Sequence, residues 1–498
     1  MKILMVSSEA VPFAKTGGLA DAVSALSIAL AKLGNEVKIV IPRYYNIDRT
    51  VLTPLEGEMG VPMGQGIEEW CAVHKTELPG SPATAPVEIF FIDHEIFFGR
   101  DGIYGTPFEP DFADNARRFT FFARAAFQLC SKIQWFPDVF HSHDWPSALV
   151  PVYLKYALRV GPLEKSVSVL TIHNLGYQGI YNKDTFSYTG LDWNVFYEGG
   201  FEDWNMLNML KAGISSADRL NTVSEAYCAE TKTGNYGCRL DGALRYRSED
   251  YCGILNGVDT EVWNPQKDAY IPKHYSAADL KGKAAAKKAL QKAFNLPENP
   301  DVPVLGMVTR LTGQKGVGEL FGPSYGSAYS ICKDMNLNFV MIGTGESWCE
   351  QELRHLSSEL SNFKAQIGYS EKLGHLIEAG SDFFLMPSRY EPCGLNQMYS
   401  LAYGTLPIVR NTGGLADTVQ NYDEASGGGT GFMFDDLTPQ AIYNTVGWAM
   451  WAYHNRPEHI AAMRKRGMKH DFSWKGAAQK YIQMYEDAAT DASKRMDV

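Results

Sequence analysis

Residues 2–41 read KILMVSSEAVPFAKTGGLADAVSALSIALAKLGNEVKIVI. The apolar run Ile3–Val6 is short and unbroken, as in a buried parallel strand. Apolar residues then recur at helical spacing from Val23 to Leu33, and Gly34 is a typical helix end. The run Val37–Ile41 supplies the next strand. The stretch therefore predicts a β-α-β unit.

The same alternation continues along the chain. Helix-compatible segments separate several of the further apolar runs, which are Val87–Ile92, Val139–Phe140, Val167–Ile172, Leu220–Val223, Val304–Val308, Phe339–Ile342, Phe383–Met386 and Leu406–Val409. Strands that alternate with helices form mostly parallel sheets. We therefore expect an α/β protein.

The clearest break in this pattern follows Gly253–Gly257. Residues 258–302 are polar, with a Lys/Ala-rich helical pattern at Lys281–Phe294 and prolines from Pro297 onward. We therefore expect a Rossmann-like domain over residues 1–255, an interdomain connection over 256–302 and a second Rossmann-like domain over 303–473. Residues 474–498 have a helical pattern, and we expect this helix to pack back on the N-terminal domain.

Length and composition exclude several classes of protein. The chain has 498 residues, of which 45% are hydrophobic, which excludes wholesale disorder. Its net charge of -11 disfavours a protein that tracks nucleic-acid phosphates. The first apolar run is too short for a signal peptide, and no membrane span is present. The eight cysteines are scattered, as in reduced cytosolic proteins, so we expect a cytoplasmic location without membrane or nucleic-acid partners.

A six-residue repeat points to ligand binding. Thr16–Asp21 and Thr412–Asp417 are both TGGLAD, and each copy follows an expected strand and precedes a helix. Glycines before a helix let a ligand approach the backbone, where the first N–H groups attract an anion. Two tight turns without ligands are the alternative, but we favour one phosphate- or sugar-binding loop in each domain.

Polar residues follow many of the expected strands. Ligands bind at the carboxyl ends of parallel strands, and two such domains facing each other would place these residues on both walls of one cleft. Arg310 and Lys315 lie at one strand end, where two cations suit a diphosphate, and a helix-start salt bridge is the alternative. The strand-end groups are Ser7–Glu9, His141–Asp144, His173–Asn174, Asn256, Gly343–Glu346 and Ser388–Glu391.

Missing motifs narrow the chemistry further. The sequence contains no P-loop, no complete G-x-G-x-x-G and no D-x-D pair. His141 and His143 have metal-ligand chemistry, but no third ligand is near them in the sequence. We therefore expect no metal and no other cofactor.

Several longer motifs carry a family resemblance. They are Lys15–Asp21 (KTGGLAD), Pro387–Leu395 (PSRYEPCGL), Tyr403–Pro407 (YGTLP), His143–Trp145 (HDW), His173–Leu175 (HNL), Leu255–Gly257 (LNG) and Gln314–Gly316 (QKG). With these motifs collinear from about residue 2 to Trp474, the chain resembles the bacterial glycogen synthases and plant-type starch synthases. The resemblance implies a GT-B fold, with two Rossmann-like domains across a deep cleft. It also implies that glucose passes from ADP-glucose to the non-reducing end of an α-1,4-glucan such as glycogen, with retention of configuration.

The resemblance also implies roles for individual residues. The N-terminal domain would be the acceptor side and the C-terminal domain would bind the nucleotide sugar. The catalytic residues would be Glu391, His173, Asp144 and Lys15. The donor would be bound by Lys15, Gly18, Arg310, Lys315, Tyr369 (stacked on adenine), Leu395, Thr412, Gly413 and Gly414. The sugar and acceptor pocket would contain Asp21, His173, Asn174 and Asn256.

The sequence leaves alternatives for mechanism and function. Retention is possible by same-face attack assisted by the departing phosphate or through a covalent intermediate on Glu391. Pro146, Gly318 and Asn396 depart from the family pattern, as does the Gly322-Pro323 pair in an expected helix. Two alternative functions therefore stand beside a glycogen synthase. One is a retaining glucosyltransferase that uses UDP-glucose or short maltodextrins, and the other is a catalytically impaired protein that binds glucan or nucleotide.

Overall fold

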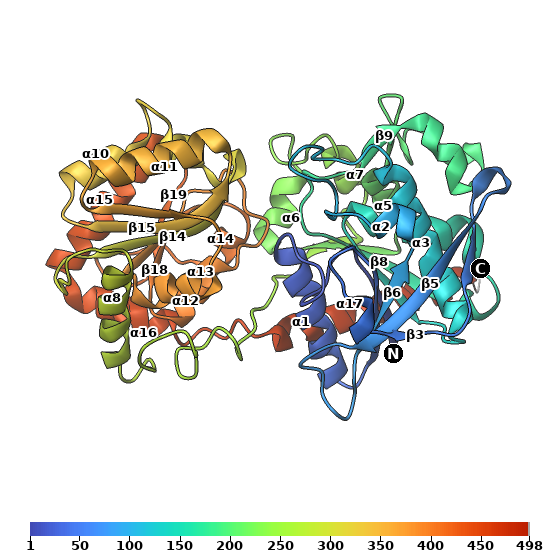
Figure 1. Ribbon diagram of the computed structural model, residues 1–498, viewed down its shortest axis with the longest axis horizontal. Helices are drawn as coiled ribbons and strands as arrows, with labels where there is room; N and C mark the ends of the chain where they lie inside the picture. The colour runs from blue at the N-terminus through green and yellow to red at the C-terminus, as the bar shows by residue number, and fades with distance from the viewer. Residues whose placement is uncertain (497–498) are drawn as a thin grey trace. The chain divides into compact units, whose positions relative to one another are not determined.

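The computed structural model describes residues 1–496, which fold into two compact units (Figure 1). Unit 1 comprises Met1–Gly257 together with the helix that starts at Trp474, and unit 2 comprises Val258–Ser473. Most of the segment that the sequence predicts as an interdomain connection thus belongs to unit 2. There, helix α8 (Lys281–Ala293) packs against α12 (Glu371–Gly380), because its buried residues, such as Leu290, join the core of that unit.

Unit 1 is built on a ten-stranded sheet with the order β13-β12-β8-β7-β1-β2-β6-β5-β3, with β4 paired to β5. Pairing is parallel from β13 to β6 and antiparallel in β3, β4 and β5. The strands are β1 (Lys2–Val6), β2 (Glu36–Pro42), β3 (Thr53–Pro54), β4 (Met59–Pro62), β5 (Glu68–Glu77), β6 (Glu88–Asp93), β7 (Val139–His143), β8 (Val167–Ile172), β12 (Arg219–Thr222) and β13 (Tyr251–Gly253). A small second sheet contains β9 (Ile180–Asn182), β10 (Glu202–Asp203) and β11 (Met206–Asn208).

The helices of unit 1 cover this sheet. The last of them, α17 (Trp474–Met496), packs against α1 and β8, although some 300 residues separate it from β8 in the sequence. The others are α1 (Gly18–Lys32), α2 (Glu95–Phe98), α3 (Asn115–Lys132), α4 (Leu149–Tyr153), α5 (Met209–Ser216), α6 (Glu225–Thr231) and α7 (Asp241–Tyr246).

Unit 2 has a six-stranded, fully parallel sheet with the order β16-β15-β14-β17-β18-β19. Its strands are β14 (Val304–Leu311), β15 (Asn338–Gly345), β16 (Phe363–Ile367), β17 (Phe383–Met386), β18 (Leu406–Arg410) and β19 (Phe432–Phe434). Its helices besides α8 and α12 are α9 (Val317–Phe321), α10 (Ser327–Asp334), α11 (Ser347–Glu359), α13 (Asn396–Ala402), α14 (Gly413–Thr418), α15 (Pro439–Asn455) and α16 (Pro457–Gly467).

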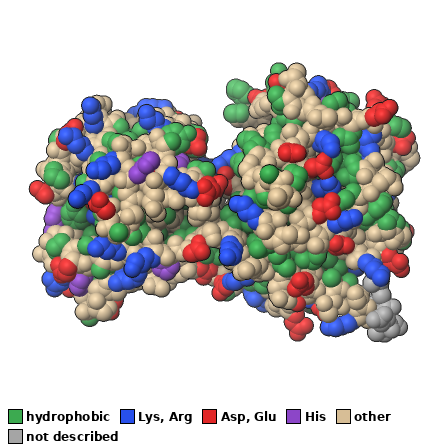
Figure 2. All heavy atoms as spheres, turned by 90° about the horizontal axis from the view of Figure 1, so that it is seen from below, with side chains coloured by type: hydrophobic (Ala, Val, Ile, Leu, Met, Phe, Trp, Pro, Cys, Tyr) green, Lys and Arg blue, Asp and Glu red, His purple; other side chains and the backbone are tan. Residues whose placement is uncertain are grey.

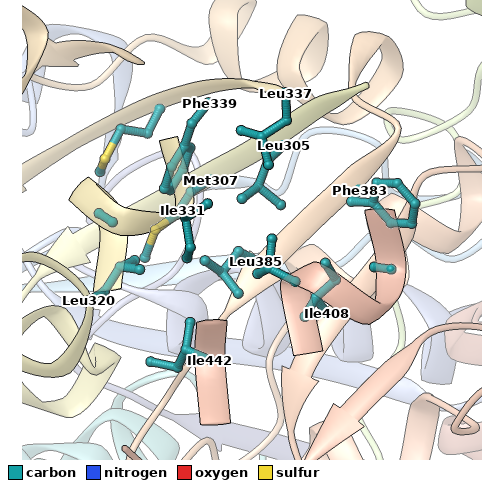
Figure 3. Close-up of a cluster of buried hydrophobic side chains, with 14 of the residues drawn as sticks. Leu305, Met307, Leu320, Ile331, Leu337, Phe339, Phe383, Leu385, Ile408 and Ile442 are labelled. Atoms are coloured by element: carbon teal, nitrogen blue, oxygen red, sulfur yellow. The ribbon is translucent and has the colours of Figure 1, made fainter. Parts of the chain in front are cut away.

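Helices bury both faces of the unit 2 sheet (Figure 1). Along β15, Phe339 and Met341 join the core under α10, α11 and α15, whereas Val340 and Ile342 join the core under α8 and α12. Figure 3 shows part of the first of these cores, in which strand side chains such as Met307 cluster with Ile331 of α10 and Ile442 of α15. Burial on both faces explains why the strands of this sheet read as continuous apolar runs.

Every predicted apolar run lies on a strand to within one residue, and the α/β class is confirmed. The sequence analysis did not identify β5, because only alternate residues such as Cys71 and Val73 are buried in this antiparallel strand. It also treated His141–Asp144 as a group after a strand. The structure corrects this, since β7 continues through His141 and His143, which are both buried.

The segment 317–334 forms two short helices, α9 and α10, instead of the one helix expected from the family pattern. Between them, Pro323 lacks an N–H for a continuing helix, and Ser324 has a left-handed φ of +71°. A Cβ at Gly322 would lie 2.4 Å from Cζ of Tyr325. The glycine therefore lets the tyrosine ring fold back over the break.

The distribution of charged side chains and the state of the cysteines agree with what the composition predicts. Figure 2 shows Lys and Arg side chains interspersed with Asp and Glu over the face that it displays. Within residues 1–496 no helix combines the length and the hydropathy needed to cross a bilayer. All eight cysteines are thiols, and six of them are buried.

Candidate active site

The parallel strands of unit 2 bring its predicted site residues to one edge of the sheet. Arg310 lies near the end of β14, and Ser388–Glu391 follow β17. Thr412 follows β18, and Tyr369 follows β16. The carboxyl edge of such a sheet is the usual place for ligands.

Glu391 is held by two side chains at this edge. Its side chain is 7% exposed, and Oε2 lies 2.6 Å from Nζ of Lys315. Ser388 Oγ donates to the same oxygen at 2.8 Å. The other oxygen, Oε1, has no hydrogen-bond partner within residues 1–496. The carboxylate is therefore fixed through one oxygen and can offer the other to a substrate.

Backbone geometry places Lys315 beside Glu391. Gly316 has φ +70°, and a Cβ there would lie 1.9 Å from the carbonyl oxygen of Pro387. Only glycine lets the chain turn this close to the loop after β17. The N–H of Arg389 donates to the carbonyl of Gln314 at 2.8 Å, which ties the two loops together.

Arg310 and Tyr369 have exposed side chains at the same edge of the sheet. The Arg310 side chain is exposed, and within residues 1–496 its guanidinium makes no hydrogen bond or ion pair. An unpaired guanidinium suits an incoming phosphate. Tyr369 is 78% exposed, and the preceding Gly368 has φ +118°. Leu395 lies half-buried where α13 begins.

The start of α14 does not supply all the donors that the sequence suggested. The N–H of Gly414 donates to the carbonyl of Glu391 at 3.0 Å, and the N–H groups of Leu415 and Ala416 donate to Thr412. These groups are therefore used within the protein. The N–H of Gly414 thus supports the backbone of Glu391 and is not directed to a diphosphate.

The departures from the family pattern fit the structure. Asn396 Nδ2 donates to the carbonyl of Val308 in β14 at 2.8 Å. Pro146 lies in the first turn of a 3-10 helix, Trp145–Ser147, where its missing N–H costs no bond. A Cβ at Gly318 would have only Tyr325 Oη near it, at 3.9 Å. None of the three disturbs the described contacts of Glu391.

Unit 1 has a corresponding edge, where Asp144 follows β7 and His173 follows β8. Asp144 Oδ1 accepts from the N–H of His173 at 2.6 Å and from the N–H of Asn174 at 3.3 Å. Burial raises the pKa of Asp144 to about 7, although both N–H groups lower it. Its backbone has φ +56° and ψ −175°, a region that is almost exclusive to glycine and that often marks functional sites.

Three histidines lie close together at this edge. Nδ1 of His143 is 3.0 Å from Nε2 of His173, and the rings of His141 and His143 are 4.2 Å apart. Burial lowers the pKa of His141 and of His173 to about 3, and that of His143 well below its ordinary value. All three rings are therefore neutral at physiological pH.

The buried carboxylate of Glu9, a residue that is 2% exposed, anchors the loop before α1. Glu9 accepts from the backbone N–H and the hydroxyl of Thr16, and Tyr104 Oη donates to it at 2.6 Å. Lys15 Nζ forms an exposed ion pair with Asp21 at 2.8 Å. No side chain caps the start of α1, and a Cβ at Gly17 would have no atom within 4 Å. The loop backbone is thus open to a ligand.

Asn256 completes the unit 1 set. It is 7% exposed, and its Oδ1 has no hydrogen-bond partner within residues 1–496. In the same part of the chain, no group of three His, Cys, Asp or Glu side chains could hold a metal ion. The histidines at the β7 edge pair with each other and with hydroxyl groups instead.

The structure thus groups the predicted residues into two sets. In unit 2 it joins Lys315 to Glu391, and in unit 1 it joins Asp144 to His173 and Asn174. The residues that support these sets are Glu9, His143, Ser388 and Gln397. The sequence analysis placed the first three only among the strand-end groups, without a supporting role, and gave no role to Gln397. Gln397 donates to the carbonyls of Cys393 and Gly394. The sequence signal that could have identified these supporting residues was their position next to strand ends and to motif residues.

Comparisons with known proteins agree along the whole chain. Residues 2–246 match the family described as starch synthase catalytic domain, and residues 289–469 match glycosyl transferases group 1. The chain is 58% identical to a glycogen synthase of Treponema denticola over 98% of each chain. It is 44% identical to glycogen synthase 1 of Geobacter metallireducens, over 97% of this chain and 95% of the relative. The structure matches the catalytic domain of starch synthase IV from Arabidopsis thaliana, bound to ADP and acarbose, with a TM-score of 0.88 and 29% identity over 98% and 99% of the two chains.

Proposed function

Because the chain belongs to the glycogen and starch synthase family of glycosyltransferases and is an enzyme of glucan synthesis, we propose that it uses ADP-glucose as donor and the non-reducing end of an α-1,4-glucan as acceptor. Glucose is transferred with retention of configuration. The observation that carries this proposal is the edge of unit 2, where Lys315 holds Glu391 and Arg310 is unpaired within residues 1–496. The ADP and acarbose bound to the matched starch synthase IV support the choice of donor and acceptor class.

The chemistry needs a stabilised leaving group. As the bond between glucosyl C1 and the phosphate oxygen breaks, negative charge grows on the departing diphosphate. Arg310 and Lys315 stabilise this charge, which is the largest expected contribution to the rate. The new bond joins C1 to the acceptor hydroxyl oxygen, whose proton passes to the departing phosphate in a same-face reaction. Glu391 contacts the glucosyl unit through its unoccupied Oε1.

Unit 1 residues bind sugar in this proposal. Asp144 fixes the backbone of His173 and Asn174, and the Asn256 Oδ1 supplies a buried acceptor for a sugar hydroxyl. Lys15, in the open loop before α1, and Gly18, the first residue of that helix, approach the donor. Asp21, in the first turn of α1, belongs to the acceptor side. Tyr369 stacks on the adenine of the donor.

The proposal includes no metal or other cofactor, since two side-chain cations serve the diphosphate. It also places the enzyme in the cytoplasm, where thiols such as the six buried cysteines stay reduced. Its substrates are a nucleotide sugar and a glucan, without nucleic acid or membrane partners.

The test is nucleoside diphosphate release from ADP-glucose and from UDP-glucose, each with and without glycogen, alongside label incorporation into glucan. We expect ADP release that depends on glycogen, matches incorporation and is unchanged by EDTA. Faster turnover of UDP-glucose, or of short maltodextrins than of glycogen, would favour the alternative transferase. Folded protein that binds glycogen but turns over neither donor would make it an impaired binding protein.

A further inference from the structure

The imidazole rings of His143 and His173 form a hydrogen bond with each other at the edge of unit 1. His143 ends β7, and His173 follows the paired strand β8. Nδ1 of the first ring lies 3.0 Å from Nε2 of the second. A neutral imidazole has one N–H and one bare nitrogen, so one ring donates and the other accepts.

Burial decides the direction of this hydrogen bond. His143 is 1% exposed, and its other nitrogen, Nε2, is buried without a partner within residues 1–496. A buried N–H without an acceptor is rarer and costlier than an acceptor without a donor. The proton of His143 is therefore on Nδ1, and His143 is the donor.

The ring proton of a neutral His173 can then be only on Nδ1. Its Nε2 accepts from His143, so a neutral ring must carry its own proton on Nδ1. No hydrogen bond engages this Nδ1 within residues 1–496, and the half-buried side chain lies at the ligand-binding edge. Asp144 holds the backbone N–H of the same residue at 2.6 Å. The backbone and the ring of His173 are thus both fixed from the end of β7.

We propose that His143 is a positioning residue that fixes His173 as the Nδ1–H tautomer, so that His173 donates a hydrogen bond to a hydroxyl oxygen of the bound sugar. His173 then does not accept a proton in the reaction. This inference rests on the proposed function for the identity of the ligand, but the tautomer itself is independent of turnover.

The direct test is two-bond proton–nitrogen NMR correlation on the full chain with nitrogen-15-labelled histidine, with assignments from His143→Asn and His173→Asn. We expect His143 and His173 both to carry their proton on Nδ1. In His143→Leu, which removes the donor, we expect His173 to lose its single tautomer and ring orientation and to show both the Nδ1–H and the Nε2–H forms. A wild-type His173 with its proton on Nε2 would overturn the inference, whether or not the enzyme turns over ADP-glucose.

The kinetic test separates positioning from folding. Asn at 143 can place its Nδ2 near the original Nδ1, whereas Leu cannot donate. We expect kcat/KM for ADP-glucose to fall about tenfold in His143→Leu and to recover most of that loss in His143→Asn. His141→Phe, equally buried in the same strand, is the control and should leave the His173 tautomer unchanged.

Deoxy donors identify the hydrogen bond. Across the four monodeoxy forms of ADP-glucose, we expect wild type to discriminate against one by about tenfold more than His143→Leu does. Equal discrimination by both proteins at all four positions would exclude a hydrogen bond from His173 to the sugar. Such a result together with normal turnover of ADP-glucose would refute the inference and leave the proposed function intact.

Discussion

Nζ of Lys315 lies 2.6 Å from Oε2 of Glu391, and both side chains are largely buried. The pair joins the turn after β14 to the loop after β17, so it fixes a cation and a carboxylate at the carboxyl edge of one sheet. An ammonium group has three N–H donors, and the carboxylate uses only one. Lys315 can therefore orient Glu391 and still donate to a diphosphate.

Replacement of Glu391 by Gln should abolish most of the glucosyl transfer. The amide keeps the size of the side chain and loses its charge, so stabilisation of a positive glucosyl centre is lost. We expect kcat to fall at least about 100-fold with ADP-glucose and glycogen. The KM for ADP-glucose should change much less, because the cations that bind the diphosphate remain.

This variant also leaves Lys315 without its carboxylate, which can lower the free energy of unfolding by up to about 3 kcal/mol. The double variant Glu391→Gln/Lys315→Met removes both charges and should recover part of that stability, but no activity. Wild-type turnover in folded Glu391→Gln would refute the assignment of Glu391. Glu391→Ala should likewise lose transfer without unfolding.

Arg310→Ala should weaken donor binding without affecting stability. The guanidinium is exposed and makes no hydrogen bond or ion pair within residues 1–496 that the substitution could remove. A charged hydrogen bond to phosphate contributes about 1.5–3 kcal/mol, so we expect the KM for ADP-glucose to rise about 10- to 100-fold. Arg354→Ala, at an exposed ion pair of α11, is the matched control and should leave KM unchanged.

The sequence predicted the buried strands of both sheets because parallel strands covered on two faces read as apolar runs. It could not predict β16, where only Phe363 is fully buried. The break between α9 and α10 was visible as Gly322-Pro323, but the turn that folds the Tyr325 ring back over Gly322 was not.

The site residues were predictable where they lie next to a strand end, and their partners were not. Nothing in the sequence pairs Lys315 with Glu391 or directs the N–H of Gly414 inward. The two TGGLAD copies make the same point. Gly17 has φ −160° and open space, whereas its counterpart Gly413 has φ +48°. Identical letters therefore adopt different turns, because their surroundings differ.

Alanine at Gly17 should weaken ligand binding without changing stability, whereas alanine at Gly414 should lower the stability of the fold. A Cβ at Gly17 meets nothing within 4 Å, and its extended backbone suits alanine. We expect Gly17→Ala to change the free energy of unfolding by less than about 0.5 kcal/mol, yet to raise KM for ADP-glucose about tenfold, because the methyl group blocks the approach of a ligand.

In Gly414→Ala the new Cβ would lie 2.0 Å from the carbonyl oxygen of Cys393. We expect a loss of about 1–3 kcal/mol in stability and a displaced Glu391. Thermal unfolding and initial rates on the two variants check both expectations. A Gly17→Ala protein with unchanged KM for donor and acceptor would show that no ligand approaches this loop.

The stability of unit 1 should fall as pH rises through neutrality, because of Asp144. Its pKa is about 7 in the folded chain and about 3.9 in an unfolded one, so between these values the folded state holds an extra proton. Unfolding then releases that proton, and the free energy of unfolding decreases with rising pH by at most about 1.4 kcal/mol per unit. This contribution is complete below about pH 4 and is lost as pH rises to about 7.

The buried histidines act in the opposite direction at lower pH. With a folded pKa of about 3, His141 and His173 bind protons only on unfolding below about pH 6.5, so they reduce stability as the pH falls. From pH 6.5 to 7.5 unfolded histidines are still losing protons, but their contribution is the same in wild type and in Asp144→Asn, so the difference between the two proteins isolates Asp144. Urea unfolding across this window should give a free energy of unfolding that falls with pH in wild type relative to Asp144→Asn, in which the amide cannot ionise. Parallel curves for the two proteins would show that Asp144 is already ionised in the folded enzyme at pH 6.5.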